Sequence, residues 1–271
     1  MKTLLAAAAV SLCCAVPAAA GTLEELTPYF STQYFTWREH DGGRRILKER
    51  GALFSVGVLG TVTESSVTLR GRGELFGGEV GYDGETQAPG SLPIHTQVGY
   101  FGTREELDLG YRIGPASLRL EPFGGIGHRW WLRALQDTTS TQGPVSGYTE
   151  WWQTVYGRVG ARGELEAPRD IRVVVEAGAK YPFYTGNSVN FAGSGVTTFR
   201  PGARWSGFAE AGVVYRNVKL ALIYEGFRFS RSPQKLVQTT DPLTQEIVPK
   251  HYLQPDSSSD ILGVSLGWTF R

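Results

Sequence analysis

The segment Asp260 to Phe270 alternates between two kinds of side chain. Successive side chains of a β-strand point to opposite faces, so this segment is predicted to be a strand with one apolar face. The same alternation recurs upstream, and no stretch has a helical period. The sequence therefore predicts an all-β fold of about ten strands, at 27–37, 53–63, 66–82, 104–113, 117–133, 148–166, 171–184, 203–215, 218–230 and 258–270.

The connections between these strands are predicted to alternate in length. Four are tight turns: Glu64-Ser65, Gly114-Pro115-Ala116, Ala167-Pro168-Arg169-Asp170 and Arg216-Asn217. The other five, at 38–52, 83–103, 134–147, 185–202 and 231–257, are predicted to be long loops. Short turns at one end and long loops at the other are typical of an antiparallel up-and-down β-barrel that crosses a membrane.

The amino terminus has the pattern of an export signal. Lys2 is followed by an apolar stretch and by the small residues Ala18-Ala19-Ala20. We therefore expect residues 1–20 to be a signal peptide and 21–271 to form one barrel domain. Both cysteines, Cys13 and Cys14, lie in the expected signal peptide, which excludes disulfides and thiolate metal sites from the mature chain. The 27 basic residues less Lys2 leave 26 against 26 acidic residues, so the charge does not suggest nucleic acid as a partner.

The export signal, the strand count and the sorted connections together resemble the bacterial outer-membrane β-barrel class. The size is similar to that of omptin barrels. The resemblance implies a Gram-negative outer-membrane location, contact with outer-membrane lipid and lipopolysaccharide, and recognition by the barrel-assembly machinery. In this class the last strand carries the assembly signal, which here corresponds to Leu262, Val264, Leu266, Trp268 and Phe270, followed by Arg271.

The polar faces of the predicted strands carry nearly equal numbers of basic and acidic residues. Since an unpaired charge in a confined interior costs several kcal/mol, these residues are expected to neutralise one another inside the barrel. The alternative is a soluble barrel whose charged face is solvated. The expected lumen charges are Arg70, Arg72, Glu74, Glu106, Asp108, Arg112, Arg119, Glu121, Arg158, Arg162, Glu164, Arg172, Glu176, Lys180, Glu210 and Glu225, with Lys219 beside them.

Aromatic residues gather near the predicted strand ends, as in the aromatic girdles of membrane barrels. Tyr29 and Trp37 are expected to belong to these girdles. Trp131 and Trp152 are exceptions, since the strand phase turns both inward. A bulge at Gly124-Gly125 would reverse the assignment for Trp131. With Phe227 and Phe229, the two tryptophans could line a ligand-binding pocket in the upper lumen.

No catalytic constellation is visible in the sequence. Omptin proteases use acidic pairs and an Asp-x-His element, and outer-membrane lipid hydrolases use His-x-Ser; neither element occurs around His40, His95, His128 or His251. Glu39, His40 and Asp41 form a weak candidate cation site. No cofactor and no metal are expected. The favoured function is a non-enzymatic structural or surface-interaction barrel, with a narrow channel for small or hydrophobic solutes and a hydrolase at the rim as alternatives.

Overall fold

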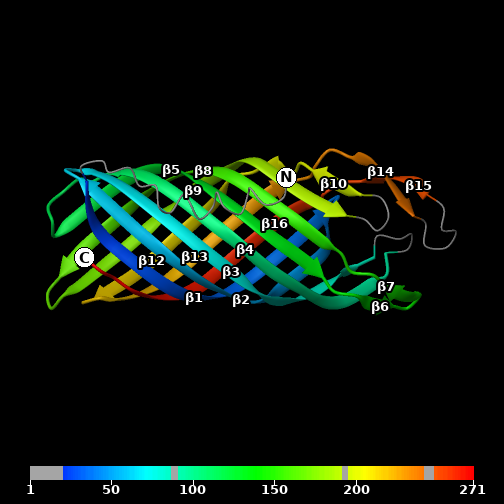
Figure 1. Cartoon of the computed structure of the whole chain (residues 1–271), viewed down its shortest axis with the longest axis horizontal. Helices are drawn as coiled ribbons and strands as arrows, with labels where there is room; N and C mark the ends of the chain where they lie inside the picture. The colour runs from blue at the N-terminus through cyan, green and yellow to red at the C-terminus, as the bar shows by residue number, and fades with distance from the viewer. Residues whose placement is uncertain (1–20, 87–90, 191–194, 241–246) are drawn as a thin grey trace.

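The computed structural model describes residues 21–86, 91–190, 195–240 and 247–271. The predicted signal peptide, 1–20, lies outside the described residues. Ten long antiparallel strands form the wall of a closed barrel (Figure 1), which confirms the predicted fold. They are β1 (Thr22–Asp41), β2 (Arg44–Glu64), β3 (Val67–Glu85), β4 (Pro93–Tyr111), β5 (Leu118–Leu135), β8 (Thr149–Ala167), β9 (Ile171–Asn190), β12 (Ser206–Tyr215), β13 (Val218–Ser230) and β16 (Asp256–Trp268).

The first and last strands close the barrel. β16 pairs with β1 from Tyr29↔Gly267 to His40↔Asp256, and each of the other strands pairs with the next along the chain. An additional bridge between Leu26 and Phe270 extends this seam to the short-turn end. Since every edge is paired, the wall has no exposed strand edge. The described part of the chain contains no helix with the length and hydropathy of a membrane span.

The strands extend further than the alternation predicted. Residues 38–52 are not a long loop, because β1 and β2 continue to a tight turn at Gly42-Gly43, where both glycines have positive φ (57° and 84°). Most of 83–103 likewise belongs to β3 and β4. Near these strand ends both faces of a strand carry polar residues. The hydropathy alternation therefore disappears, although the backbone hydrogen bonds between the strands continue.

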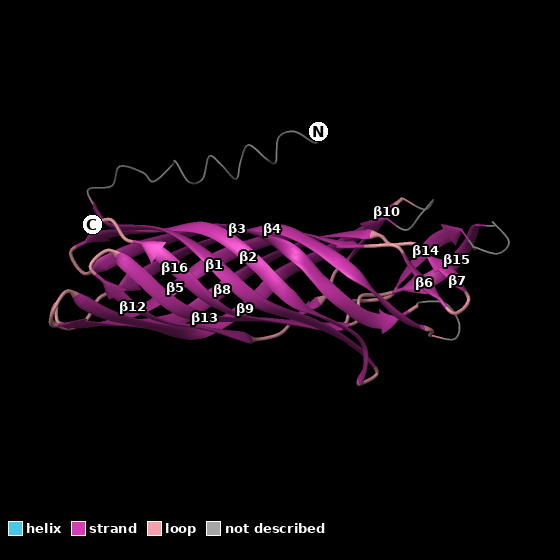
Figure 2. Cartoon of the chain, turned by 90° about the horizontal axis from the view of Figure 1, so that it is seen from below, coloured by secondary structure: helices cyan, strands magenta, loops and turns pink. Residues whose placement is uncertain are grey.

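Short hairpins lie at the end of the barrel opposite the four turns that the sequence predicted to be tight (Figure 2). We call this the hairpin end, and the other the short-turn end. The segments predicted as the loops 134–147 and 231–257 contain the hairpins β6–β7 (Thr138–Ser140 and Gly143–Val145) and β14–β15 (Lys235–Thr240 and Ile247–Tyr252). Two further short strands, β10 (Val196–Phe199) and β11 (Gly202–Ala203), pair with β9 and β13 respectively.

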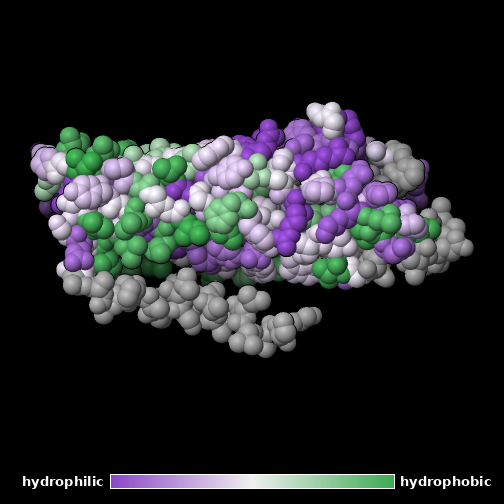
Figure 3. All heavy atoms as spheres, turned by 90° about the horizontal axis from the view of Figure 1, so that it is seen from above, coloured by the Kyte–Doolittle hydropathy of each residue, from purple (hydrophilic) through white to green (hydrophobic). Residues whose placement is uncertain are grey.

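The outer surface carries an apolar belt. Hydrophobic residues gather toward the short-turn end, and hydrophilic residues are denser at the hairpin end (Figure 3). The side chains of the predicted assembly signal project outward and are about half exposed, whereas Ile261 of β16 points into the core. Aromatic residues such as Trp268 and Tyr215 border the belt at the short-turn end, and Phe101 and Trp130 border it toward the hairpin end.

The strand phase runs without interruption through Gly124-Gly125. Gly124 pairs with Val159 and Gly125 with Arg158 in regular register, so Trp131 points inward. A register shift occurs instead between β8 and β9 at Val155/Tyr156. Two expected girdle residues were assigned wrongly. Tyr29 and Trp37 both point into the lumen, because they share the inward parity of β1 with the buried Ser31 and Phe35.

Candidate functional site: a filled lumen

The middle of the lumen is crossed by arginine–carboxylate networks. Arg162, 1% exposed, donates from Nε to Glu176 at 2.9 Å and from Nη1 to Glu121. Arg158 donates to the other Glu176 oxygen at 2.8 Å and contacts Glu106. Each guanidinium thus bridges carboxylates from different strands. Arg70 on β3 lies 3.7 Å from Glu176 on β9, so the network also spans the lumen. Removing one charge would leave its partners buried and uncompensated.

Toward the hairpin end a second layer surrounds Glu225. This carboxylate contacts both Arg104 and Lys180, and Arg104 also donates to Glu74 at 2.9 Å. The phenol of Tyr29 also donates to Glu74, at 2.7 Å. The Lys180 ammonium lies 3.4 Å from the centroid of the Phe227 ring, which adds a cation–π contact. This layer joins the ionic part of the lumen to the aromatic part.

A third layer closes the short-turn end. Arg112 contacts Glu24 at 2.6 Å and Glu121 at 3.1 Å, and Arg172 contacts Glu25 at 2.6 Å. Glu24 and Glu25 were missed in the sequence because they precede the first predicted strand. The expected lumen charges all take part in these layers. Their further contacts are Arg70–Glu176 3.7 Å, Arg72–Glu106 3.7 Å, Arg72–Glu210 3.2 Å, Lys219–Glu210 2.5 Å, Arg158–Asp108 3.5 Å, Arg162–Asp108 3.5 Å, Arg119–Glu24 3.5 Å and Arg172–Glu164 3.7 Å.

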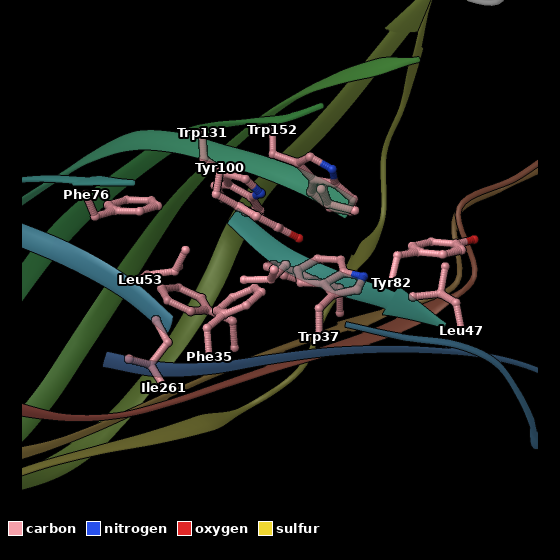
Figure 4. Close-up of a cluster of buried hydrophobic side chains, with 14 of the residues drawn as sticks. Phe35, Trp37, Leu47, Leu53, Phe76, Tyr82, Tyr100, Trp131, Trp152 and Ile261 are labelled. Carbon is pink, nitrogen blue, oxygen red and sulfur yellow. The ribbon is translucent and has the colours of Figure 1, made fainter. Parts of the chain in front are cut away.

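Aromatic rings fill the lumen on the hairpin-end side of the ionic layers. Trp131 and Trp152 stack with ring centroids 5.3 Å apart, and Trp37 meets Trp152 edge-on at 5.1 Å (Figure 4). Phe229 lies 5.8 Å from Trp152 and 6.2 Å from Phe227. The four residues expected to form a pocket therefore lie in one cluster. The space among these rings does not admit a water molecule. We call this cluster the aromatic plug.

Arg129 stands inside the aromatic plug. It is 5% exposed, and its guanidinium carbon lies 4.6 Å from the centroid of the Phe76 ring and 5.0 Å from that of Phe227. Among the described residues no carboxylate lies within ion-pair distance of it. Its positive charge is stabilised by the faces of aromatic rings rather than by an anion.

A charge cluster seals the plug from the hairpin end. Arg133, 1% exposed, contacts Glu150 at 2.9 Å, Glu39 at 4.0 Å and Glu49. Trp37 Nε1 donates to Glu39 at 2.8 Å and Trp152 Nε1 donates to Glu150 at 2.7 Å. One arginine thus faces three buried carboxylates, so the group has an excess of negative charge when all are ionised.

The excess charge is reflected in the titration of Glu39. The outward-facing Arg38 beside it and Arg50 across the hairpin place this part of the barrel beyond the apolar belt. Burial raises the pKa of Glu39 to about 7 against the opposing effect of Arg133, and the negative charges of Glu150 and Glu49 add to the rise. The cluster was missed in the sequence because its residues fell in segments predicted to be loops or strand margins.

Among the described residues, no acid–histidine pair lies inside the barrel. Two acid–histidine pairs form, Asp83–His95 at 3.2 Å and Glu105–His128 at 2.9 Å, and both project from the outer face of the wall. The candidate cation site at Glu39, His40 and Asp41 is not assembled, because its two carboxylates have different partners. Glu39 turns into the lumen, while Asp41 contacts Arg231 at 3.2 Å. Within the described ranges no group of acids and histidines is arranged to hold a metal ion.

Comparison with known proteins identifies the fold. No protein-family model and no curated protein matches the sequence. The outer-membrane protease OmpT of Escherichia coli has a similar structure, with a TM-score of 0.54 at 14% identity over 93% of this chain and 99% of that chain. The transport unit of the E. coli autotransporter AIDA-I matches with a TM-score of 0.46 at 10% identity over 98% of both chains. The translocator domain of the Neisseria meningitidis autotransporter NalP matches with a TM-score of 0.38 at 14% identity over 96% of both chains.

Proposed function

We propose that this chain is an integral protein of the bacterial outer membrane whose lumen is closed to ions and solutes, and that it acts as a structural or surface-interaction protein. The observation that supports this function most directly is that two kinds of packing close the lumen, buried ion pairs and packed aromatic rings. Three layers of ion pairs lie on the short-turn side of the aromatic plug, and the Arg133 cluster lies on its hairpin-end side. A diffusing ion would have to displace both buried salt bridges and packed rings.

The strands that continue past the apolar belt supply the interaction surface. At the hairpin end the outer face of the wall carries basic side chains on neighbouring strands, including Arg38, Lys48 and Arg50. Positive charges immediately above the aromatic border lie at the level of the phosphate groups of the outer leaflet. We propose that this surface contacts lipopolysaccharide. The β6–β7 and β14–β15 hairpins would then extend beyond it toward other partners.

Single-channel recording on the purified protein in a planar bilayer tests the closed lumen. We expect stable insertion without a steady conductance, since no water-filled path passes the two seals. Insertion is verified separately by labelling a cysteine placed beside the exposed turn, Arg45→Cys, and the label is unambiguous because residues 21–271 contain no other cysteine. A steady open conductance from labelled, inserted protein contradicts the proposal.

The lipopolysaccharide contact has an independent test. Reversing the basic surface with Lys48→Glu and Arg50→Glu is expected to reduce co-purifying lipopolysaccharide, because like charges would then face the lipid phosphates. The matched control is Glu79→Gln and Asp83→Asn, which removes outward acidic groups from the next strand. Equal lipopolysaccharide content in both variants and in wild type contradicts this contact while leaving the closed lumen unaffected.

A further inference from the structure

One ionisable pair lies on the outside of the barrel within the apolar belt. Glu105 on β4 and His128 on β5 are register partners, and Glu105 Oε2 lies 2.9 Å from His128 Nδ1. Both side chains are about one third exposed. On the same two strands, Phe101 and Trp130 lie on the hairpin-end side of the pair, with ring centroids 6.4 Å apart, and the exposed residues Leu107 and Ile126 lie on the other.

The level of the pair places it inside the hydrocarbon of a membrane rather than at its border. Glu105 is four residues from Phe101 along β4, which is about 10 Å along the barrel axis for a strand with the usual rise and tilt. Outward positions at this depth are normally apolar. On β4 and β5, Glu105 and His128 are the acidic and basic side chains that face outward between the Phe101–Trp130 contact and the short-turn end.

The pair is also poorly satisfied compared with the charges of the lumen. Glu176 in the lumen accepts from two arginines, whereas Glu105 contacts only His128 among the described side chains. His128 Nε2 has no hydrogen-bond partner within the described structure. This nitrogen is buried against the wall, whereas the Glu105 and His128 side chains are partly exposed on the membrane face. An acid and an imidazole at this depth with a buried nitrogen left unpaired point to a polar partner inside the membrane.

The surface around the pair permits the close approach of another protein. Gly71 on β3, Gly124 on β5 and Gly157 on β8 all face outward near it, and a Cβ atom at any of the three would meet nothing within 4 Å. The barrel's own packing therefore does not require glycine at these positions. Residues without side chains leave a shallow, smooth surface on which the backbones of two proteins can come close.

We propose that this face, formed by β3, β4, β5 and β8, joins two copies of the chain into a dimer. A two-fold axis along the membrane normal between β4 and β5 places β5 of one copy against β4 of the other. His128 then faces Glu105 of the second copy, and the second copy's His128 faces Glu105. The pair is self-complementary because its acid and its base lie side by side on adjacent strands. Rotation of the imidazole ring supplies Nε2 to the facing carboxylate.

The test uses single cysteines in the region 21–271, which contains no cysteine of its own. Ile126→Cys lies beside the proposed axis, and Leu220→Cys on β13 is an equally exposed control on another part of the belt. A short bis-maleimide added to native membranes is expected to cross-link Ile126→Cys into a dimer and to leave Leu220→Cys monomeric. Equal cross-linking of both positions, a monomer at both, or a product of Ile126→Cys with a different protein contradicts the proposal.

A second measurement examines the ion pair itself. The double variant Glu105→Leu/His128→Leu makes the belt uniformly apolar, so it is expected to fold normally and to lower the dimer association constant in liposomes by about tenfold or more, as measured by energy transfer at several protein-to-lipid ratios. Glu105→Gln keeps a hydrogen-bonding side chain and is expected to have a smaller effect. A folded double variant that dimerises like wild type overturns the role of the pair. Heat-modifiable migration in gels reports whether each variant is folded.

Discussion

Trp131 on β5 and Trp152 on β8 stack almost in parallel, with an interplanar angle of 8° and centroids 5.3 Å apart. They are register partners in adjacent strands. The indole of Trp152 also donates to Glu150, which contacts Arg133. The aromatic plug and the charge cluster above it are therefore one packed unit, and a change in either is expected to affect the closure of the lumen.

Shortening the stacked pair should loosen the seal. Trp131→Ala/Trp152→Ala removes two large buried rings, and each substitution of this kind costs about 3–5 kcal/mol of stability. We expect faster entry of small hydrophobic solutes into liposomes that contain the variant, because the ionic layers below become more accessible. Trp130→Ala and Trp151→Ala, which remove outward-facing tryptophans next in sequence, are the controls. A decrease in uptake relative to wild type would instead support a conduit that uses the rings as a binding pocket.

Buried ion pairs of the lumen should contribute more to the free energy of unfolding than exposed ion pairs. Arg162→Met leaves Glu176 and Glu121 buried without this partner, for which we expect a loss of about 3–5 kcal/mol in the free energy of unfolding. Arg44→Met removes an exposed pair in which Arg44 donates to a carboxylate oxygen of Glu85 at 2.7 Å. Solvent screens this pair, so the expected loss of stability is much smaller than that of Arg162→Met. Urea unfolding in lipid vesicles measures both. Equal losses in the two variants would contradict the central role of the lumen network.

The Arg133 cluster should make the hairpin end sensitive to pH. Because the pKa of Glu39 is raised to about 7 in the folded protein, the folded state holds its proton more tightly than the unfolded chain does. Stability is therefore expected to fall as pH rises from about 4.5 to 7. Glu39→Gln removes this titration and should make the hairpin end more stable than wild type at pH 8.

Amide hydrogen exchange of β1 and β2 near Gly42-Gly43 at pH 5 and pH 8 measures this effect. The expected result is greater protection at pH 5 in wild type and a smaller difference in Glu39→Gln. Asp83→Asn, an outward acid near the same end, is the matched control and should retain the wild-type dependence. A wild-type profile that is flat across this range, or protection that rises with pH, contradicts the assignment to Glu39.

The outward residues of β16 are predicted to act in assembly. Phe270 is half exposed and forms a bridge with Leu26, so its ring contributes to the belt rather than to the core. Phe270→Ala is expected to reduce the fraction of folded, heat-modifiable protein in the outer membrane several-fold while changing the stability of the folded fraction little. Phe54→Ala on β2, equally exposed, is the control. Equal effects of the two substitutions would contradict a specific signal in β16.

The sequence by itself determined the class of the fold and the direction of most strand side chains. Alternation at Leu262, Val264 and Leu266 can be satisfied only by a strand with one apolar face, and balanced charges on the opposite faces require partners inside a closed wall. These properties are local or compositional. The inward direction of Trp131 followed from the same counting, since no bulge occurs at Gly124-Gly125.

Tertiary structure decided which residues meet. Glu39 and Glu49 on the first two strands meet Arg133 and Glu150 on β5 and β8, and nothing in their local segments indicates this meeting. The tertiary structure also determined where the strands end, because the hydrogen bonds between strands continue beyond the residues in which the hydropathy alternates. Likewise, the Glu105–His128 pair depends on the register between β4 and β5. Register is set by closure of the whole barrel, so it cannot be read from one strand alone.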